Sequence, residues 1–194
     1  MAPSRLPREQ RRAQLLAAAA AAFRAGGYDK TTVDQIAQSA GVSRLIVYRI
    51  FESKENLYRQ VLRDVLADLA ARFVGLSFDD VADQGAASVI LPVARAHPDA
   101  FRLLWRDAWH QPPFEDIAEE FRSYVTIFAR AILSRYITDE VVLQWASLTA
   151  GAHLIEGICN WLDHGDPARD EAIAVMMTAG MRGLGAAWVQ SSSR

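Results

Sequence analysis

Apolar residues recur along almost the whole chain at the three- and four-residue spacing that is typical of amphipathic helices. No segment alternates apolar and polar residues as a half-buried strand would, and no internal repeat or low-complexity linker is present in the sequence. The first apolar stripe has five members: Leu15, Leu16, Ala19, Ala20 and Phe23. The pattern predicts an all-α protein of about nine helices.

Glycines and capping residues divide the first part of this pattern into helices. The pair Gly26-Gly27 suits the end of the first helix. Thr31 is expected to cap the second helix, with Asp34 in position for a capping box. Gly41 breaks the chain again before a short third helix. The expected bounds of the first four helices are residues 8–25, 32–39, 43–50 and 53–75.

Prolines and further capping residues divide the rest of the chain. Pro92 lies inside an expected fifth helix, which ends near Ala96, and should kink it. The four later helices are expected to begin at Pro98, Pro113, Thr138 and Pro167. The last two helices then span about residues 139–163 and 167–189.

The charge is divided unevenly along the chain. The net charge is −2, but residues 1–63 carry 11 Lys and Arg against 5 Asp and Glu, a net of +6, and residues 64–194 carry a net of −8. Half of the residues are hydrophobic, which is enough for a core without disulfides. The basic segment predicts a polyanionic partner. We expect two domains, at residues 1–53 and 54–194.

Other features bear on the compartment. Arg11-Arg12 precede an apolar run as in a secretory signal, but Glu9 and the alanine-rich run at helical spacing favour an amphipathic helix. The single Cys159 cannot form an intrachain disulfide. No run approaches the ~18 apolar residues of a membrane span. We expect a cytoplasmic, nucleoid-associated protein with no membrane partner.

Residues 32–51 form a helix, a glycine turn and a short second helix, which is the order of a helix-turn-helix unit. On a helical wheel Val47, Ile50 and Phe51 face inward. Leu45 faces outward, with Ile46 at the margin. These two side chains either extend the core or meet another helix, or else they contact thymine methyl groups in the DNA major groove.

Basic and polar residues share the outward face with Leu45. Arg44, Tyr48 and Arg49 suit contacts to phosphates or guanine edges. Lys54 adds charge at the start of the fourth helix. A basic arm precedes the unit, and its alternative is a solvated start of the chain: Arg5, Arg8, Arg11 and Arg12.

Residues 31–62 resemble the DNA-binding segment of the TetR family of transcriptional regulators. The matching residues fall in order and without gaps: Thr31-Thr32, Ile36-Ala37, Gly41-Val42-Ser43, Tyr48, Phe51, Lys54-Glu55 and Leu57. The resemblance covers about residues 8–63, and beyond them only the length and the helical layout agree. Many family members have histidine where this chain has Ile50, so we expect Ile50 to pack inward.

The resemblance implies a ligand-responsive homodimer that binds a palindromic operator and usually represses transcription. Carried over by position, the residues at the DNA surface are Thr32, Ser43, Arg44, Leu45 and Ile46. Tyr48, Arg49 and Lys54 would contact phosphates or base edges. The last two helices would build the dimer interface, and their small residues fit close helix packing.

The expected second domain holds all five tryptophans. Aromatic side chains there are either ordinary core or the lining of an apolar pocket for a small effector. The residues predicted to line such a pocket are Phe101, Trp105, Trp109, Phe128 and Trp145.

No catalytic residue set, paired Cys/His spacing or phosphate-binding glycine loop occurs in the sequence, so we expect neither an enzyme nor a metal or cofactor. The alternatives are a helical protein-interaction module, or an enzyme domain fused to a DNA-binding head.

Overall fold

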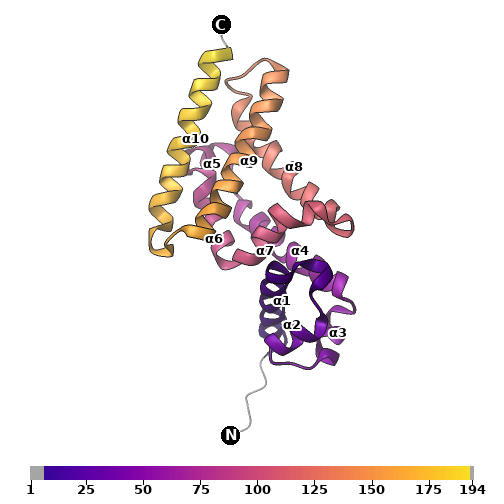
Figure 1. Ribbon diagram of the computed structural model, residues 1–194. Helices are drawn as coiled ribbons and strands as arrows, with labels where there is room; N and C mark the ends of the chain where they lie inside the picture. Colours follow the sequence, from indigo (N-terminus) through magenta and orange to yellow (C-terminus); the bar gives the residue numbers. More distant parts are fainter. Residues whose placement is uncertain (1–6, 193–194) are drawn as a thin grey trace.

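A computed structural model describes residues 7–192, which contain helices and no strand. A small head lies at one end, and a larger bundle of longer helices lies above it (Figure 1). The head holds the first three helices, and the fourth leads from it into the bundle: α1 (Arg8–Lys30), α2 (Val33–Ser39), α3 (Arg44–Phe51) and α4 (Lys54–Phe73). The all-α prediction is confirmed.

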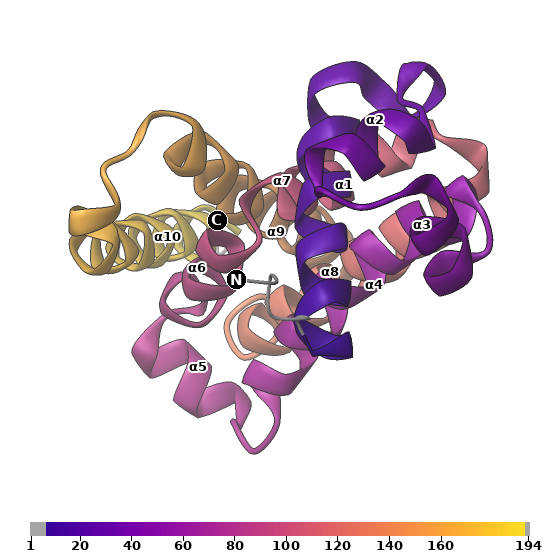
Figure 2. The same ribbon diagram turned by 90° about the horizontal axis from the view of Figure 1, so that it is seen from below.

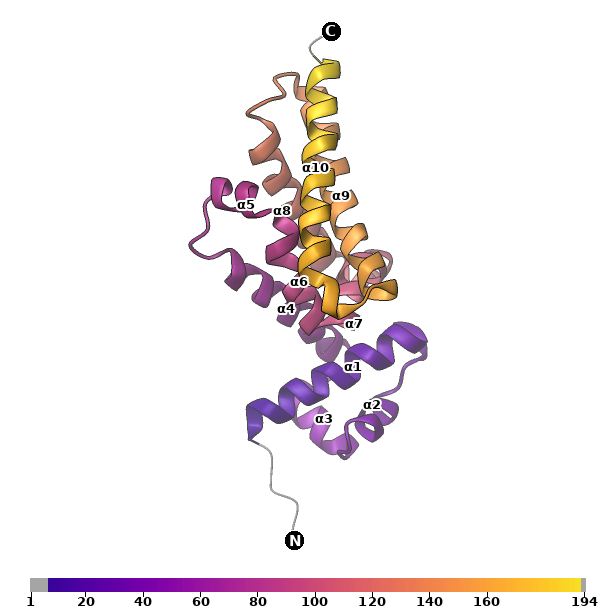
Figure 3. The same cartoon turned by 90° about the vertical axis from the view of Figure 1, so that its left-hand side faces the viewer.

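The bundle is built from six α-helices and several short turns. Its elements are α5 (Phe78–Gln84), α6 (Ala86–Ala96), α7 (Pro98–Arg102), the π-helical turn η1 (Leu103–Asp107), the 3-10 turns η2 (Ala108–His110) and η3 (Pro112–Phe114), α8 (Glu115–Leu133), α9 (Glu140–His164), the 3-10 turn η4 (Pro167–Arg169) and α10 (Asp170–Ser192). The α10 helix runs along the outside of the bundle beside α9 (Figure 3).

The start of α2 differs from the prediction by one residue, whereas α1 continues to Lys30, five residues beyond its predicted end, with non-helical backbone angles at Gly27. Thr31 is buried, and its hydroxyl donates to the carbonyl oxygens of Ala22 and Gly27 at 3.1 and 2.7 Å. Thr32 is the actual N-cap and forms a capping box with Gln35. The prediction that Thr31 caps α2 was wrong because its hydroxyl is used to close the end of α1.

The region between α4 and α8 is more broken than predicted. Gly85, at φ 84°, separates α5 from α6, and a Cβ there would lie 1.9 Å from the Thr178 hydroxyl oxygen. The expected single fifth helix is therefore two helices, and Pro92 lies inside α6. The expected sixth helix is α7 followed by η1 and η2. Asp139, rather than Thr138, caps α9 by accepting a hydrogen bond from the Val142 amide.

The main core runs continuously from the head into the bundle. The junction is aromatic: Tyr58 of α4 packs against Phe23 of α1 at 4.8 Å and against Phe114 of η3 at 4.3 Å between ring centroids. Tyr28 of α1 also packs on Phe114 at 4.9 Å. Because such rings bury large apolar areas, the head and the start of α8 are held together at this point.

The surface of α10 is unusually apolar. Ala174 is its one buried residue among those whose exposure is described, while Val175 and Met176 are exposed. By length and composition alone, residues Pro167–Ser191 could cross a membrane, with a mean hydropathy of 1.3 over the best 18-residue window. The expectation that no segment reaches this length was therefore wrong. An exposed apolar helix equally suits a protein partner.

Candidate nucleic-acid interface

The turn between α2 and α3 is fixed by Gly41. This residue has φ 64°, which glycine adopts at little cost. The amide of Val42 donates to the Ala37 carbonyl at 2.9 Å, and the Gly41 amide donates to the Gln38 carbonyl at 3.1 Å. The chain can thus reverse within a few residues and start α3 across α2. The two helices lie side by side at the head end of the molecule (Figure 2).

The inner face of α3 anchors it to the head. Val47 and Phe51 are buried, and Ile50 is partly buried against the same core. The predicted inward face is therefore confirmed, including the packing of Ile50. Ile46 and Tyr48 are partly buried against this core as well. The exposed residues of α3, which remain available to an external partner, are Arg44, Leu45 and Arg49.

The outer face of α3 exposes one aliphatic side chain among basic ones. Leu45 is 77% exposed, whereas the rest of the apolar residues of α3 are buried or partly buried. Arg49, one turn after Leu45, is exposed and forms no ion pair with any residue in 7–192. An isolated leucine on a small surface carries little meaning by itself, but its combination with unpaired arginine suits DNA.

Arg44 is exposed but already has partners. Its Nη1 lies 2.9 Å from the Asp34 carboxylate, and its Nη2 donates to the Tyr48 hydroxyl at 3.3 Å. The hydrogen bond to Tyr48, followed by the charge of Asp34, raises the pKa of Arg44. Asp34 was expected in a capping box, but Gln35 fills that role. The ion pair is solvent-exposed and hence weak, so Arg44 can exchange it for a phosphate.

Two of the residues predicted to contact DNA lie at the N-terminal ends of helices. Thr32 and Ser43 are exposed N-caps of α2 and α3. The Thr32 hydroxyl accepts the Gln35 amide at 3.2 Å, whereas the Ser43 side chain makes no capping bond. Both residues therefore lie beside the N-terminal amides of their own helices.

Lys54 has a role within the protein that the sequence does not reveal. Its Nζ donates to the carbonyl oxygens of Tyr28 and Thr31 at 2.9 and 3.3 Å and lies 4.3 Å from the Tyr28 ring centroid. Lys54 thus ties the start of α4 to the end of α1. Its predicted phosphate contact stays a prediction. Of the predicted basic arm, Arg5 lies outside the described residues, and Arg12 pairs with Asp64 at 2.9 Å.

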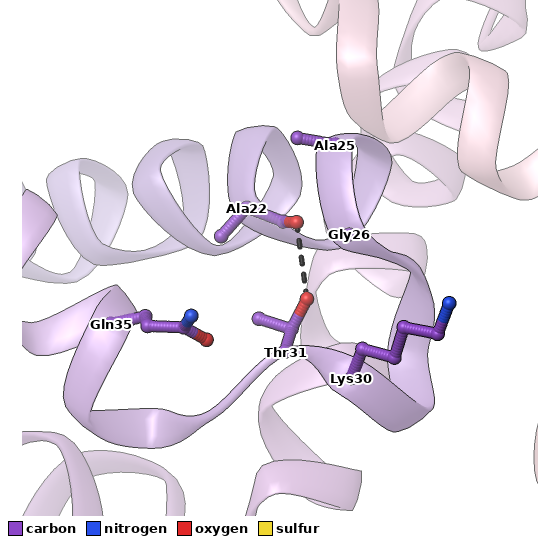
Figure 4. Close-up of a pocket in the computed structure, with 6 residues that line it drawn as sticks. All are labelled: Ala22, Ala25, Gly26, Lys30, Thr31 and Gln35. Atoms are coloured by element: carbon purple, nitrogen blue, oxygen red, sulfur yellow. Dashed lines mark hydrogen bonds between the residues drawn. The ribbon is translucent and has the colours of Figure 1, made fainter.

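A hollow of about 380 Å³ lies between α1 and α2 (Figure 4). Lys30, Thr31 and Gln35 provide its polar lining. The hydrogen bond from Thr31 to Ala22 crosses it. This hollow holds no charged pair, and the groups that line it are used in the capping contacts described above.

The five residues predicted to line an effector pocket do not form one cluster of ring contacts. Phe101 and Trp105 are buried and each contacts Phe121 at 6.0 Å between ring centroids. Trp109 is 43% exposed. The other two lie in separate ring contacts: Phe128 with Phe73 and Phe78, and Trp145 with Trp188. One shared pocket for all five is therefore absent from the described structure, and each effector contact stays a prediction.

Polar contacts tie α4 to the start of α8. Arg59 donates to the Asp116 carboxylate at 3.0 Å and also to the Pro113 carbonyl. Arg63, one turn later, pairs with Glu120. Sequence reasoning missed these residues because their partners lie more than fifty positions away. They connect the bundle to the helix that follows the head.

Comparison with known proteins finds a family model that matches the same segment. Residues 15–61 match the family model described as bacterial regulatory proteins, tetR family. The chain is 48% identical over 60 residues to the HTH-type transcriptional activator FasR of Mycolicibacterium smegmatis, covering 31% of this chain and 27% of that protein. It is 44% identical over 63 residues to the HTH-type transcriptional repressor KstR2 of the same species, covering 32% and 31%. The matches thus span less than a third of either relative.

The fold extends the likeness to nearly the whole chain. A TetR-like transcriptional regulator from Rhodococcus sp. RHA1 has a TM-score of 0.68 over 93% of this chain and 98% of its own, at 22% identity. These three proteins are named as regulators of transcription and not as enzymes, in agreement with the sequence-based expectation. Within residues 7–192, no group of three or more His, Cys, Asp or Glu side chains is placed to hold a metal ion.

Proposed function

We propose that this chain, whose residues 15–61 match the tetR family model, regulates transcription as a homodimer on a palindromic operator. In this proposal it represses its target genes until a small apolar or amphipathic effector releases it. The site of action is the bacterial nucleoid in the cytoplasm. The observation that carries the proposal is the outer face of α3, where an exposed leucine stands beside an unpaired arginine.

The proposed DNA contacts divide by chemistry. Arg49 and Arg44 bind phosphates or guanine edges, because guanidinium groups provide several donors in a fixed plane. Leu45, with Ile46 at its margin, contacts thymine methyl groups. Thr32, Ser43 and Tyr48 have hydroxyls that can donate to phosphate oxygens. Lys54 would reach a phosphate only by leaving its carbonyl partners at the end of α1.

The proposed dimer uses α9 and α10. Val141, Trp145 and Leu148 of α9 are exposed, and so are Val175 and Met176 of α10. Such a set of apolar side chains is unfavourable in water unless a partner covers it. A second copy of the chain would do so through the same surface, as two-fold symmetry requires. The two α3 helices would then meet successive major grooves ~34–36 Å apart.

The proposed release works through α4. An effector lowers operator affinity only if it binds the conformation with a different α3 spacing more tightly than the DNA-bound one. The α4 helix is held to the head by Lys54 and to the start of α8 by Arg59 and Arg63. A shift of α8 therefore reaches the head through these contacts.

We propose that the protein represses, rather than activates, its target genes. The relatives include a named activator and a named repressor, so the sign is a separate question from DNA binding. Reporter expression with and without the gene would determine it. Higher expression in the deletion strain supports repression, and lower expression supports activation.

Binding to duplex DNA from the gene's own promoter, titrated with salt, tests the central proposal. We expect sequence-specific binding. The logarithm of its association constant should fall steeply and linearly with the logarithm of the salt concentration. Genomic fragments selected by binding would extend the test beyond that promoter. The absence of specific, salt-sensitive binding to any genomic DNA would contradict the proposed function.

A further inference from the structure

Arg122 of α8 is enclosed by two tryptophans. Its guanidinium carbon lies 4.1 Å from the ring centroid of Trp105 and 5.0 Å from that of Trp109. Its Nη2 donates to the Trp105 carbonyl at 2.9 Å. Its Nε is buried and has no hydrogen-bond acceptor. Burial lowers the pKa of Arg122, because the charged form is partly removed from water.

Two nearby arginines form ion pairs with carboxylates, and Arg122 forms none with the described residues. Arg102 donates to Asp163 at 2.6 Å. Arg106 lies 2.7 Å from Asp163 and 2.5 Å from Glu156. In the part of the chain that the structure describes, no carboxylate lies within 4.0 Å of the Arg122 guanidinium. A partly desolvated cation without a counter-ion is costly unless something supplies the opposite charge.

We propose that Arg122 binds the anionic group of an amphipathic effector, with Trp105 and Trp109 as the walls of the anion site. The inference rests on the proposed effector response and names the class of the effector. Carboxylate and phosphate groups both match the donor geometry of a guanidinium. The apolar part of the ligand would pack on Trp109, which is 43% exposed, because the rings that continue inward from Trp105, those of Phe121 and Phe101, are buried in the core.

Trp109 is the outer wall and the side from which a ligand enters. It is partly exposed, whereas Trp105 is only 7% exposed and its indole nitrogen donates to Glu156 at 3.0 Å. Trp109 follows the π-helical turn η1, a local widening of the helix that is frequent at functional sites. The inner wall is thus fixed by a hydrogen bond, and the outer wall is partly exposed to solvent.

The anion site lies on the same helix as the contacts that hold α4. Asp116 and Glu120, which pair with Arg59 and Arg63, precede Arg122 on α8 by six and two residues. A ligand that pulls on Arg122 therefore acts on the start of α8. From there the ion pairs reach α4, and Phe114 reaches the aromatic junction with the head.

Calorimetric titration of the full-length protein with decanoate, monodecyl phosphate and decanol tests the anion site. We expect at least one of the two anions to bind about tenfold or more tightly than decanol, which has the same tail and no charge. The two anionic probes distinguish a carboxylate ligand from a phosphate ligand. Equal affinity for all three probes, or no binding by either anion, would overturn the inference.

Variants locate the anion preference. Arg122→Gln is expected to remove the tenfold preference, and Arg122→Lys to restore part of it. Arg72→Gln, which removes an exposed arginine of α4, should leave it unchanged. Trp109→Ala provides a second, milder change and should weaken anion binding roughly threefold. Anion binding that is unchanged in both Arg122→Gln and Trp109→Ala would contradict the proposed site.

Two further measurements separate this inference from the proposed function. If Arg122→Gln converts a dimer into a monomer in size-exclusion chromatography, Arg122 is an interface residue and the inference fails. If wild-type protein binds its operator but shows no anion preference, the inference fails and the proposed function stands. If it shows the anion preference but binds no DNA, the ligand site stands and the proposed function fails.

Discussion

Two helices of this protein, α3 and α10, expose aliphatic side chains, and they differ in what surrounds those side chains. On α3, Leu45 follows Arg44 directly and lies one turn before Arg49. On α10, Val175 and Met176 lie in a stretch that has no charged residue between Glu171 and Arg182. An exposed aliphatic group alone would not distinguish the two helices.

The charged neighbours distinguish the partners. A lone leucine between cations fits a polyanion that also carries methyl groups, which describes the DNA major groove. A long uncharged apolar stretch fits another apolar protein surface, because desolvating it costs little. The comparison therefore supports the proposals that α3 contacts DNA and that α10 contacts a second copy of the chain. The following changes test these proposals.

The largest effect is expected on the α10 face. The double change Val175→Asp and Met176→Asp places two charges in the proposed interface, so the dimer should dissociate. Operator affinity should fall by roughly 100-fold or more, because two linked half-site contacts become one. Analytical ultracentrifugation and operator titration measure the two effects. Val74→Asp changes another exposed valine, outside this face, and should alter neither.

Arg49→Ala should weaken operator binding about tenfold, since one good contact to a base or phosphate is worth ~1–3 kcal/mol. Its free energy of unfolding should change by less than about 0.5 kcal/mol, because Arg49 forms no ion pair with residues 7–192. Operator titration and chemical denaturation provide both values. A large loss of stability would instead make Arg49 a structural residue. Arg72→Ala is the matched control on α4.

Leu45→Ala should cost less, about threefold in affinity, since only a few methyl contacts are lost. The loss should be confined to one thymine-bearing position in each half-site. Replacing that thymine by uracil removes the methyl group from the DNA instead. On the uracil operator, wild type and Leu45→Ala should bind equally, and equal losses at every base position would contradict methyl recognition.

Lys54→Met should have the smallest effect on DNA. It removes the hydrogen bonds to the end of α1 and should lower the free energy of unfolding by about 1 kcal/mol. Thermal unfolding, together with the salt dependence of operator binding, measures the balance. A reduced salt dependence at unchanged stability would show that Lys54 contacts a phosphate, as the sequence predicts.

The sequence is most informative where a local rule decides the structure. The glycine turn, the cap at Ser53 and the inward face of α3 depend on residues a few positions apart, and all three are present. The cap of α2 was misplaced because two threonines compete for it, and Thr31 is taken by the end of α1. Such a choice depends on tertiary contacts that no local pattern contains.

Contacts between distant segments are beyond such rules. At the break between α5 and α6, Gly85 lies so close to Thr178 of α10, almost a hundred residues away, that a Cβ would not fit. The aromatic pattern identified Trp105 and Trp109 as candidates, but it could not show that Arg122 lies against both. The missing acid partner of Arg122 is likewise a property of the folded chain. Residue types alone make this arginine equivalent to Arg102 and Arg106.

All of the tryptophans lie in the bundle, so tryptophan fluorescence reports on the bundle and not on the head. The helices of the head contain none, and all five lie beyond residue 100: Trp105, Trp109, Trp145, Trp161 and Trp188. DNA bound at α3 therefore has no indole beside it to quench. A change of tryptophan emission when operator DNA is added would be a direct signal of rearrangement in the bundle. The same emission could be followed while an effector is added. Because the coupling between DNA and effector is reciprocal, the two titrations should report the same coupling free energy.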